Sequence, residues 1–192
     1  MSDLMFADEE PGEWEGPQAE PEGSAWAVLV VDDDPEVHAV TRLILNGLRF
    51  RDRPLSLLSA HSAAEARALL EEGVDPAVIL LDVVMETEHA GLDLVRHIRE
   101  DRDDHAVRII VRTGQPGRAP EDRVVREHEI NDYRVKTDLT SRKLTTALLA
   151  GLRDYAHIRE LEAARAERDA LAARLRACGC EGASGADGER LS

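Results

Sequence analysis

Aromatic residues and cysteines are scarce in this chain of 192 residues. Phe, Trp and Tyr together make up 3% of it, so a folded core has to be built from Leu, Val, Ile and Ala. The only cysteines, Cys178 and Cys180, lie close to the C-terminus, where they cannot cross-link a core. The sequence therefore gives no reason to expect an oxidising compartment.

Positive charge is also in short supply, because the formal net charge is −15. Residues 1–24 carry eight acidic residues and no Lys or Arg, so the net charge of the remaining chain is −15 + 8 = −7. Without a cluster of Lys and Arg to contact phosphates, we expect no direct binding to nucleic acid. No apolar run approaches the roughly 20 residues that cross a membrane, and the N-terminus lacks the basic start of a secretory signal. We therefore expect a cytoplasmic protein that makes no membrane contact.

Composition divides the chain into four parts. Residues 1–24 are rich in Glu, Pro and Gly and are predicted to be a disordered acidic tail. Apolar and helical patterns begin at residue 25 and predict a globular domain over residues 25–150. Residues 151–178 continue the last predicted helix, and the Gly- and Ser-rich residues 179–192 are predicted to be disordered.

Apolar runs alternate with helix-like stretches through the globular part. This alternation predicts an α/β fold in which helices cover both faces of a parallel sheet. Two helix starts carry capping signals: Pro35 behind Asp34, and Ser62 followed by Glu65. The predicted strands are 27–31, 55–59, 77–81, 107–111 and 130–136, and the predicted helices are 35–48, 62–73, 90–101, 119–128 and 140 onward.

The last predicted helix is unusually long and rich in Glu, Arg and Ala. Leu161, Ala164, Leu171 and Leu175 follow the spacing of a coiled-coil seam, with Arg168 interrupting it. Two interpretations stay open: a short coiled coil that joins two copies of the chain, and a lone helix that packs on its own domain.

Polar side chains follow four of the predicted strands where each strand ends. Asp32 and Asp33 follow the first strand, and Asp82 follows the third. Thr113 follows the fourth strand and Lys136 ends the fifth, so all lie at one edge of a parallel sheet. Converging carboxylates need a cation, and oxygen ligands in an open cleft suit Mg²⁺. A carboxylate beside Mg²⁺ can accept a phosphoryl group, whose oxygens the lysine and the hydroxyl would then contact.

Four motifs stand at these strand ends: VLVVDDDP at 28–35, LLDVVM at 80–85, VRTG at 111–114 and YRVK at 133–136. Together they resemble the motifs of response-regulator receiver domains, over about residues 25–150. The resemblance implies a flavodoxin-like, doubly wound sheet of five parallel strands in the order 2-1-3-4-5, here with an extended C-terminal helix. It also assigns roles to single residues. The implied Mg²⁺ ligands are Asp32, Asp33, Asp82 and the backbone carbonyl of Val84, the phosphoacceptor is Asp82, the switch residues are Thr113 and Tyr133, and the phosphate-binding lysine is Lys136.

The same resemblance implies a protein of two-component signalling. A histidine kinase or a phosphotransfer protein would donate the phosphoryl group to Asp82, and the signal would pass on by protein–protein interaction or dimerisation. We expect no enzymatic activity beyond gain and loss of that group. Several stretches, such as INDYRVKTDLT, are similar to receivers fused to HD-GYP or GGDEF cyclic-dinucleotide enzymes. About 40 residues follow residue 150, so we expect no such output domain here.

Two positions depart from the receiver pattern. Glu86 follows Met85 where Pro is usual, so we expect a reshaped loop after Asp82. The usual Lys-Pro pair is Lys136-Thr137 here, and we expect a trans peptide because a cis bond before a residue other than Pro costs about 3–4 kcal/mol.

Two other functions stay open. A phosphorylation-independent scaffold, or pseudo-receiver, is compatible with the altered loop after Asp82. An aspartyl phosphatase of the haloacid-dehalogenase type also attacks with a strand-end Asp, but it needs a second Asp two residues later. Val84 occupies that position here and cannot transfer a proton, which weighs against the enzyme.

Overall fold

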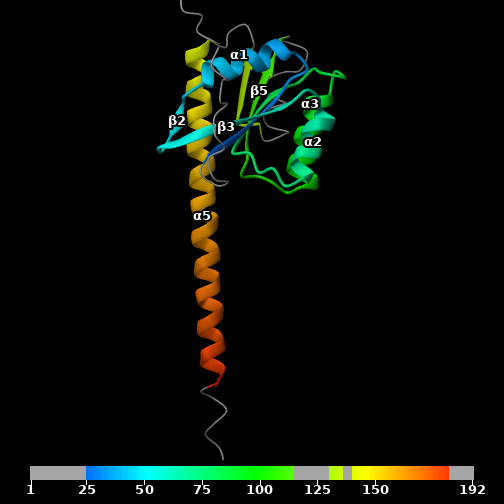
Figure 1. Ribbon diagram of the computed structural model, residues 1–192. Helices are drawn as coiled ribbons and strands as arrows, with labels where there is room; N and C mark the ends of the chain where they lie inside the picture. Colours follow the sequence, from blue (N-terminus) through cyan, green and yellow to red (C-terminus); the bar gives the residue numbers. More distant parts are fainter. Residues whose placement is uncertain (1–24, 115–129, 136–139, 182–192) are drawn as a thin grey trace, which may run out of the picture.

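The computed structural model describes residues 25–114, 130–135 and 140–181, with side chains described as far as Arg176. These residues form one sheet with helices on both of its faces (Figure 1). In chain order the elements are β1 (Trp26–Val31), α1 (Pro35–Leu45), β2 (Arg49–Phe50), β3 (Arg53–Ala60), α2 (Ala63–Glu71), β4 (Val78–Asp82), α3 (Ala90–Arg96), the π-helical turn η1 (His97–Asp101), β5 (Arg108–Thr113), β6 (Asp132–Val135) and α5 (Ser141–Glu181).

The sheet has the strand order β2-β3-β1-β4-β5-β6. Strands β3, β1, β4, β5 and β6 run parallel in the predicted order, while β2 adds a short antiparallel strand beside β3. The sequence did not predict β2, because its hairpin lacks the usual glycine or asparagine. Arg51 and Asp52 adopt positive φ angles of 49° and 61° there instead.

The two central strands, β1 and β4, are buried on both faces, as their unbroken apolar runs predict. Successive side chains of a strand point to opposite faces. Leu29 and Ile79 accordingly pack in a core cluster with α2 and α3, while Val30 and Leu80 pack in a second cluster with α5. Figure 1 shows α2 and α3 on one side of the sheet and α5 on the other. These two layers hold the carboxyl ends of the strands at a fixed edge.

Both predicted capping signals are confirmed. The Asp34 carboxylate accepts a hydrogen bond from the backbone N–H of Glu36 (2.8 Å), and the Ser62 hydroxyl accepts one from that of Glu65 (3.1 Å). The Glu65 carboxylate in turn accepts from the backbone N–H of His61 at 2.7 Å. These caps satisfy backbone donors that a helix start leaves without partners.

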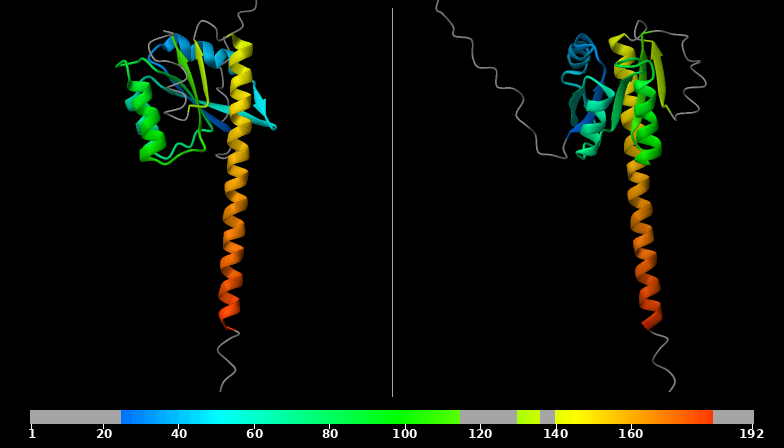
Figure 2. Two further views of the ribbon diagram at one scale, coloured as in Figure 1. Left: turned by 180° about the vertical axis from the view of Figure 1, so that it is seen from behind. Right: turned by 90° about the vertical axis from the view of Figure 1, so that its right-hand side faces the viewer.

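Helix α5 is 41 residues long and crosses residue 150 without a break. Leu148, Leu152 and Tyr155 pack on the sheet, so the packed part of the helix extends past the predicted domain boundary at residue 150. Beyond Ile158 nearly all described side chains are exposed, and the helix projects away from the domain (Figure 2). It ends at Glu181 rather than at residue 178. Among the described helices, none is both long and apolar enough to span a bilayer.

Several sequence predictions fall outside the described residues. They are the acidic tail 1–24, the helix predicted at 119–128, the Lys136-Thr137 peptide, and residues 182–192 of the C-terminal tail.

Candidate functional site

The carboxylates of Asp32, Asp33 and Asp82 gather at the carboxyl edge of the sheet, as predicted. One oxygen from each lies within 4.8 Å of the other two. Strands β1 and β4 pair up to Val31 and Leu81, which makes Asp32 and Asp82 adjacent. Asp32 and Asp82 are buried, at 0% and 5% exposure, whereas Asp33 is exposed. The cluster is therefore anchored in the protein and open to solvent on one side.

Backbone N–H groups contact the two buried carboxylates, and a histidine contacts the backbone of Asp32. The backbone N–H of Asp34 donates to Asp32 Oδ1 (3.2 Å), and that of Val84 donates to Asp82 Oδ1 (3.4 Å). His38 on α1, which is also buried, bonds through Nε2 to the backbone carbonyl of Asp32 at 2.7 Å. Because a carbonyl can only accept, Nε2 must carry a proton. The end of β1 is thus tied to α1 beside the site.

The residues present fit a hard divalent cation. Carboxylates that converge this closely repel one another, and they offer only oxygen ligands, which Mg²⁺ prefers. The predicted fourth ligand, the backbone carbonyl of Val84, belongs to the loop that follows Asp82. The hydrogen bond from the Val84 N–H keeps this loop close to the Asp82 carboxylate.

Sequence reasoning missed Arg112, which is buried in the same site. Arg112 is the β5 partner of Asp82 in the strand register, and its side chain is 3% exposed. Its Nη2 lies 3.5 Å from Asp32 Oδ2, and its Nη1 donates a hydrogen bond to the Thr41 hydroxyl on α1 (3.0 Å). The alternation of side chains along a strand could have indicated the burial of Arg112. Residue 112 points to the same face of the sheet as the buried Ile110.

Burial and the nearby carboxylates act on Arg112 in opposite directions. Burial lowers the pKa of its guanidinium from the ordinary value, while the charges of Asp32 and Asp82 raise it. The ordinary pKa of arginine lies far above neutral pH, so the guanidinium stays protonated near neutral pH. The site therefore contains a permanent positive charge next to its carboxylates.

The two predicted switch residues lie on one face of neighbouring strands. Thr113 ends β5 and is 2% exposed. Tyr133 on β6 pairs with Val111 in the register and is partly buried against the α2 and α3 cluster. Because Val111 and Thr113 point to the same face, the ring and the hydroxyl share it. Lys136 lies outside the described residues.

The loop after Asp82, which departs from the receiver pattern, is held by specific contacts. The Glu86 carboxylate accepts a hydrogen bond from the backbone N–H of Ala63 (2.9 Å), the first residue of α2. Met85 is buried at 8% exposure. The unusual Glu86 thus fastens this loop to the start of α2.

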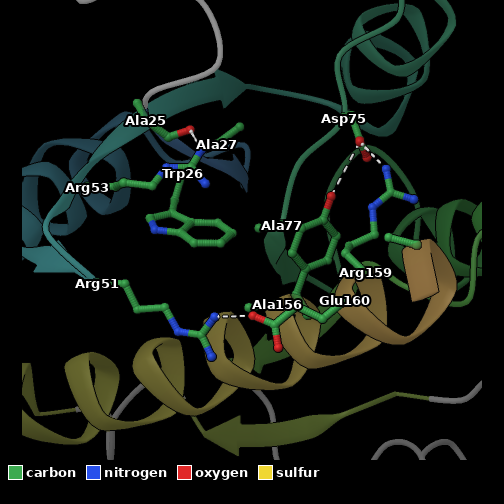
Figure 3. Close-up of a pocket in the computed structure, with 12 residues that line it drawn as sticks. Ala25, Trp26, Ala27, Arg51, Arg53, Asp75, Ala77, Ala156, Arg159 and Glu160 are labelled. Carbon is green, nitrogen blue, oxygen red and sulfur yellow. Dashed lines mark hydrogen bonds and ion pairs between the residues drawn. The ribbon is translucent and has the colours of Figure 1, made fainter. Parts of the chain in front are cut away.

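A groove of about 720 Å³ lies at the opposite end of the strands, at the start of β1. Trp26, Asp75 and Arg159 line it (Figure 3). Tyr155 also lines this groove. The Tyr155 hydroxyl donates to Asp75 (3.3 Å), and Arg159 also contacts that carboxylate at 2.8 Å. Burial, then the Asp75 charge, raises the pKa of Tyr155. This groove shares no residue with the carboxylate cluster and is no part of the candidate site.

Comparison with known proteins identifies relatives of the chain. Residues 28–163 match the family described as "Response regulator receiver domain". The chain is 57% identical over 130 residues to a 3'3'-cGAMP-specific phosphodiesterase 2 of Vibrio cholerae. That match covers 68% of this chain but only 25% of the relative, so the chain spans a quarter of that protein's length. It is also 32% identical over 109 residues to the chemotaxis protein CheY1 of Helicobacter pylori, covering 57% of this chain and 83% of that protein.

A solved structure shares the fold. The signal receiver domain of an HD domain-containing protein from Pseudomonas fluorescens superposes with a TM-score of 0.60 at 21% identity. The match covers 69% of this chain and 98% of that structure.

Proposed function

The chain belongs to the response regulator receiver domain family, and from this premise we propose that it is the phosphoacceptor of a two-component signalling system. One observation carries the proposal: Asp82 ends a central strand within reach of Asp32 and Asp33. The family predicts that arrangement for a residue that takes up a phosphoryl group.

Asp82 is the nucleophile in this proposal. One carboxylate oxygen attacks the phosphorus of a phosphohistidine on the donor protein, a P–O bond forms, and the P–N bond to the donor breaks. The N–H of Val84 orients the Asp82 carboxylate for this attack. Asp32, Asp33, Asp82 and the Val84 carbonyl would hold Mg²⁺, which, when bound, offsets the repulsion between the carboxylates and the incoming phosphoryl oxygens.

Residues at the ends of the neighbouring strands would contact the negatively charged phosphoryl group. We infer that the Thr113 hydroxyl donates a hydrogen bond to one phosphoryl oxygen and that Lys136 neutralises another. Movement of Thr113 would open room on the face that it shares with Tyr133, and the ring would follow. The surface around β5 and β6 then differs between the two states, which is what a partner can recognise.

A histidine kinase or a phosphotransfer protein is the proposed donor, in the cytoplasm. We propose that the chain signals by binding other proteins and performs no catalytic turnover on other substrates. Direct DNA binding is not part of the proposal, because the net charge is −15 and nucleic-acid phosphates are negative.

We further infer that α5 serves dimerisation. Leu161, Leu171 and Leu175 are exposed at 58%, 55% and 66% on the part of the helix that projects from the domain. With Ala164 they follow coiled-coil spacing, so a second copy of the helix would bury them. In a lone helix these side chains stay exposed to water and contribute no burial of apolar surface.

The position of Arg112 favours a second candidate function, that of a phosphorylation-independent scaffold. A positive charge already stands beside Asp32, so the pocket is partly neutralised without metal. As a scaffold, the protein would bind its partners equally well with Asp82 intact or replaced by Asn.

Labelling by a small phosphoryl donor tests the proposed function. The wild type, Asp82→Asn and Asp34→Asn are incubated with acetyl phosphate and Mg²⁺ and separated on a gel that retards phosphoproteins. Asp34→Asn is the matched control, since Asp34 caps α1 and asparagine caps a helix equally well. We expect a shifted band for the wild type and the control, and none for Asp82→Asn. Equal labelling of Asp82→Asn contradicts the assignment.

A further inference from the structure

We propose that Arg112 is a built-in counter-cation of the carboxylate cluster, a positioning residue that weakens Mg²⁺ binding and so sets the Mg²⁺ concentration at which the pocket fills. The inference rests on the metal site of the proposed function and adds a residue to it. Neither the family match nor the resemblance assigns a role to this position.

The geometry places the guanidinium inside the cluster. Arg112 stands in register with Asp82 on the neighbouring strand, and Nη2 reaches across to within 3.5 Å of Asp32 Oδ2. Both side chains of that pair are almost fully buried, at 3% and 0% exposure. A buried ion pair is screened little by solvent, so its charge acts on everything nearby.

The hydrogen bond from Nη1 to Thr41 fixes where that charge stands. Thr41 is 2% exposed on α1, and the bond length is 3.0 Å. Neither Nε nor Nη2 of Arg112 has a hydrogen-bond partner within the described part of the chain. The guanidinium is thus held by a single hydrogen bond and by the field of the carboxylates, which means that carboxylate charge is its main stabilisation.

Charge balance makes Arg112 and a divalent ion competitors. The three carboxylates carry three negative charges, of which the guanidinium offsets one. One divalent ion would neutralise the remainder. Without Arg112 the same ion would meet an additional uncompensated charge and no repulsion from a neighbouring cation. Because repulsion between charges a few ångströms apart is several-fold larger inside a protein than in water, removing Arg112 should tighten Mg²⁺ binding about tenfold or more.

A purely structural role for Arg112 predicts something different. If the side chain only ties β5 to α1 through Thr41, its replacement lowers the stability and leaves the Mg²⁺ dissociation constant unchanged. The two roles therefore separate in a binding measurement.

The test compares Mg²⁺ titrations of the unphosphorylated full chain by calorimetry, for the wild type, Arg112→Met and Arg112→Lys. Arg134→Met is the matched control: Arg134 is the β6 register partner of Arg112, exposed and paired with Asp132 at 2.9 Å. The Arg134→Met substitution removes the same positive charge, but one strand further from the carboxylate cluster. Thermal unfolding with a chelator and with Mg²⁺ accompanies each titration.

We expect the Kd for Mg²⁺ to fall about tenfold or more in Arg112→Met and to change less than about threefold in Arg112→Lys and Arg134→Met. In the chelator Arg112→Met should melt below the wild type, since it removes the positive charge beside the buried Asp32 carboxylate. Mg²⁺ should then raise its melting temperature more than that of the wild type. An unchanged or weaker Kd in a folded Arg112→Met overturns the inference.

If Arg112→Met does not fold without metal, Arg112→Gln replaces it, because glutamine keeps a donor for Thr41 and lacks the charge. The same fall in Kd is then expected, and its absence overturns the inference. Lack of Mg²⁺ binding by the wild type and every variant contradicts the proposed metal site itself. Binding by the wild type with equal affinity in the uncharged variants contradicts only the role of Arg112.

Discussion

Gly91 lies directly against the backbone of Asp82. Its N–H donates a hydrogen bond to the carbonyl of Val83 at 3.1 Å, which brings the start of α3 up to Asp82, the proposed phosphoacceptor. A β-carbon on Gly91 would collide with the Asp82 carbonyl oxygen and stand 2.8 Å from the Val83 α-carbon. Only glycine lets the loop after Asp82 close in this way.

Gly91→Ala should therefore destabilise the protein. Its methyl group meets backbone atoms that cannot rotate away, so we expect a loss of about 1–3 kcal/mol in the free energy of unfolding, by analogy with overpacked cores. Gly114→Ala is the control, because a β-carbon there meets no atom of the described residues within 4 Å. Urea denaturation of both variants measures the difference. Equal stability of the two would show that the loop relaxes at no cost.

Within the described part of the chain, the Arg112 guanidinium donates its hydrogen bond to the Thr41 hydroxyl, at 3.0 Å. Thr41→Val keeps the shape and leaves a buried charged donor without its acceptor, so we expect a loss of about 1–3 kcal/mol in unfolding free energy. Thr41→Ser retains the hydroxyl and should recover most of that loss. Chemical denaturation monitored by circular dichroism compares the three proteins, and a Thr41→Val variant as stable as the wild type would contradict the contact.

Tyr155 should ionise at higher pH than an ordinary tyrosine. Burial is the main cause and the Asp75 carboxylate the next, and both favour the neutral phenol. A pKa raised in the folded state gives stability that is present below the unfolded pKa of about 10 and is lost as pH rises through the folded value. Ultraviolet titration in a Tyr133→Phe background isolates this ring. Asp75→Asn should lower its pKa, and an unchanged titration would mean that Asp75 exerts no effect.

Leu171→Lys should abolish dimerisation through α5. Leu171 is 55% exposed in the single chain and would lie in the seam of a paired helix. Ala173→Lys adds the same charge two residues away, on the far side of the helix, and should leave the assembly unchanged. Sedimentation velocity of each protein, with and without acetyl phosphate, reports the assembly. A wild type that stays monomeric in both states contradicts the proposed dimer.

The gathering of Asp32, Asp33 and Asp82 was predictable because strand ends meet at one edge of a parallel sheet. The caps at Asp34 and Ser62 were predictable because they depend on local sequence. Strand β2 was not, since it is two residues long and its turn uses positive φ at Arg51 and Asp52.

The position of Arg112 could not be predicted in the same way. Alternation along β5 places it on an inward face, but a lone arginine in a strand is usually found at an edge or with its head in solvent. Its partners, Thr41 on α1 and Asp32 just after β1, are distant from Arg112 in the sequence. Only the three-dimensional packing joins them.

Direct mapping of the phosphoryl group tests whether Asp82 is the phosphoacceptor. After incubation with acetyl phosphate and Mg²⁺, borohydride reduction converts a phosphorylated aspartate to homoserine, and peptide mass spectrometry locates it. We expect homoserine at position 82 and unmodified Asp32 and Asp33. Modification at another aspartate, or none at Asp82 under conditions in which Mg²⁺ is bound, would contradict it.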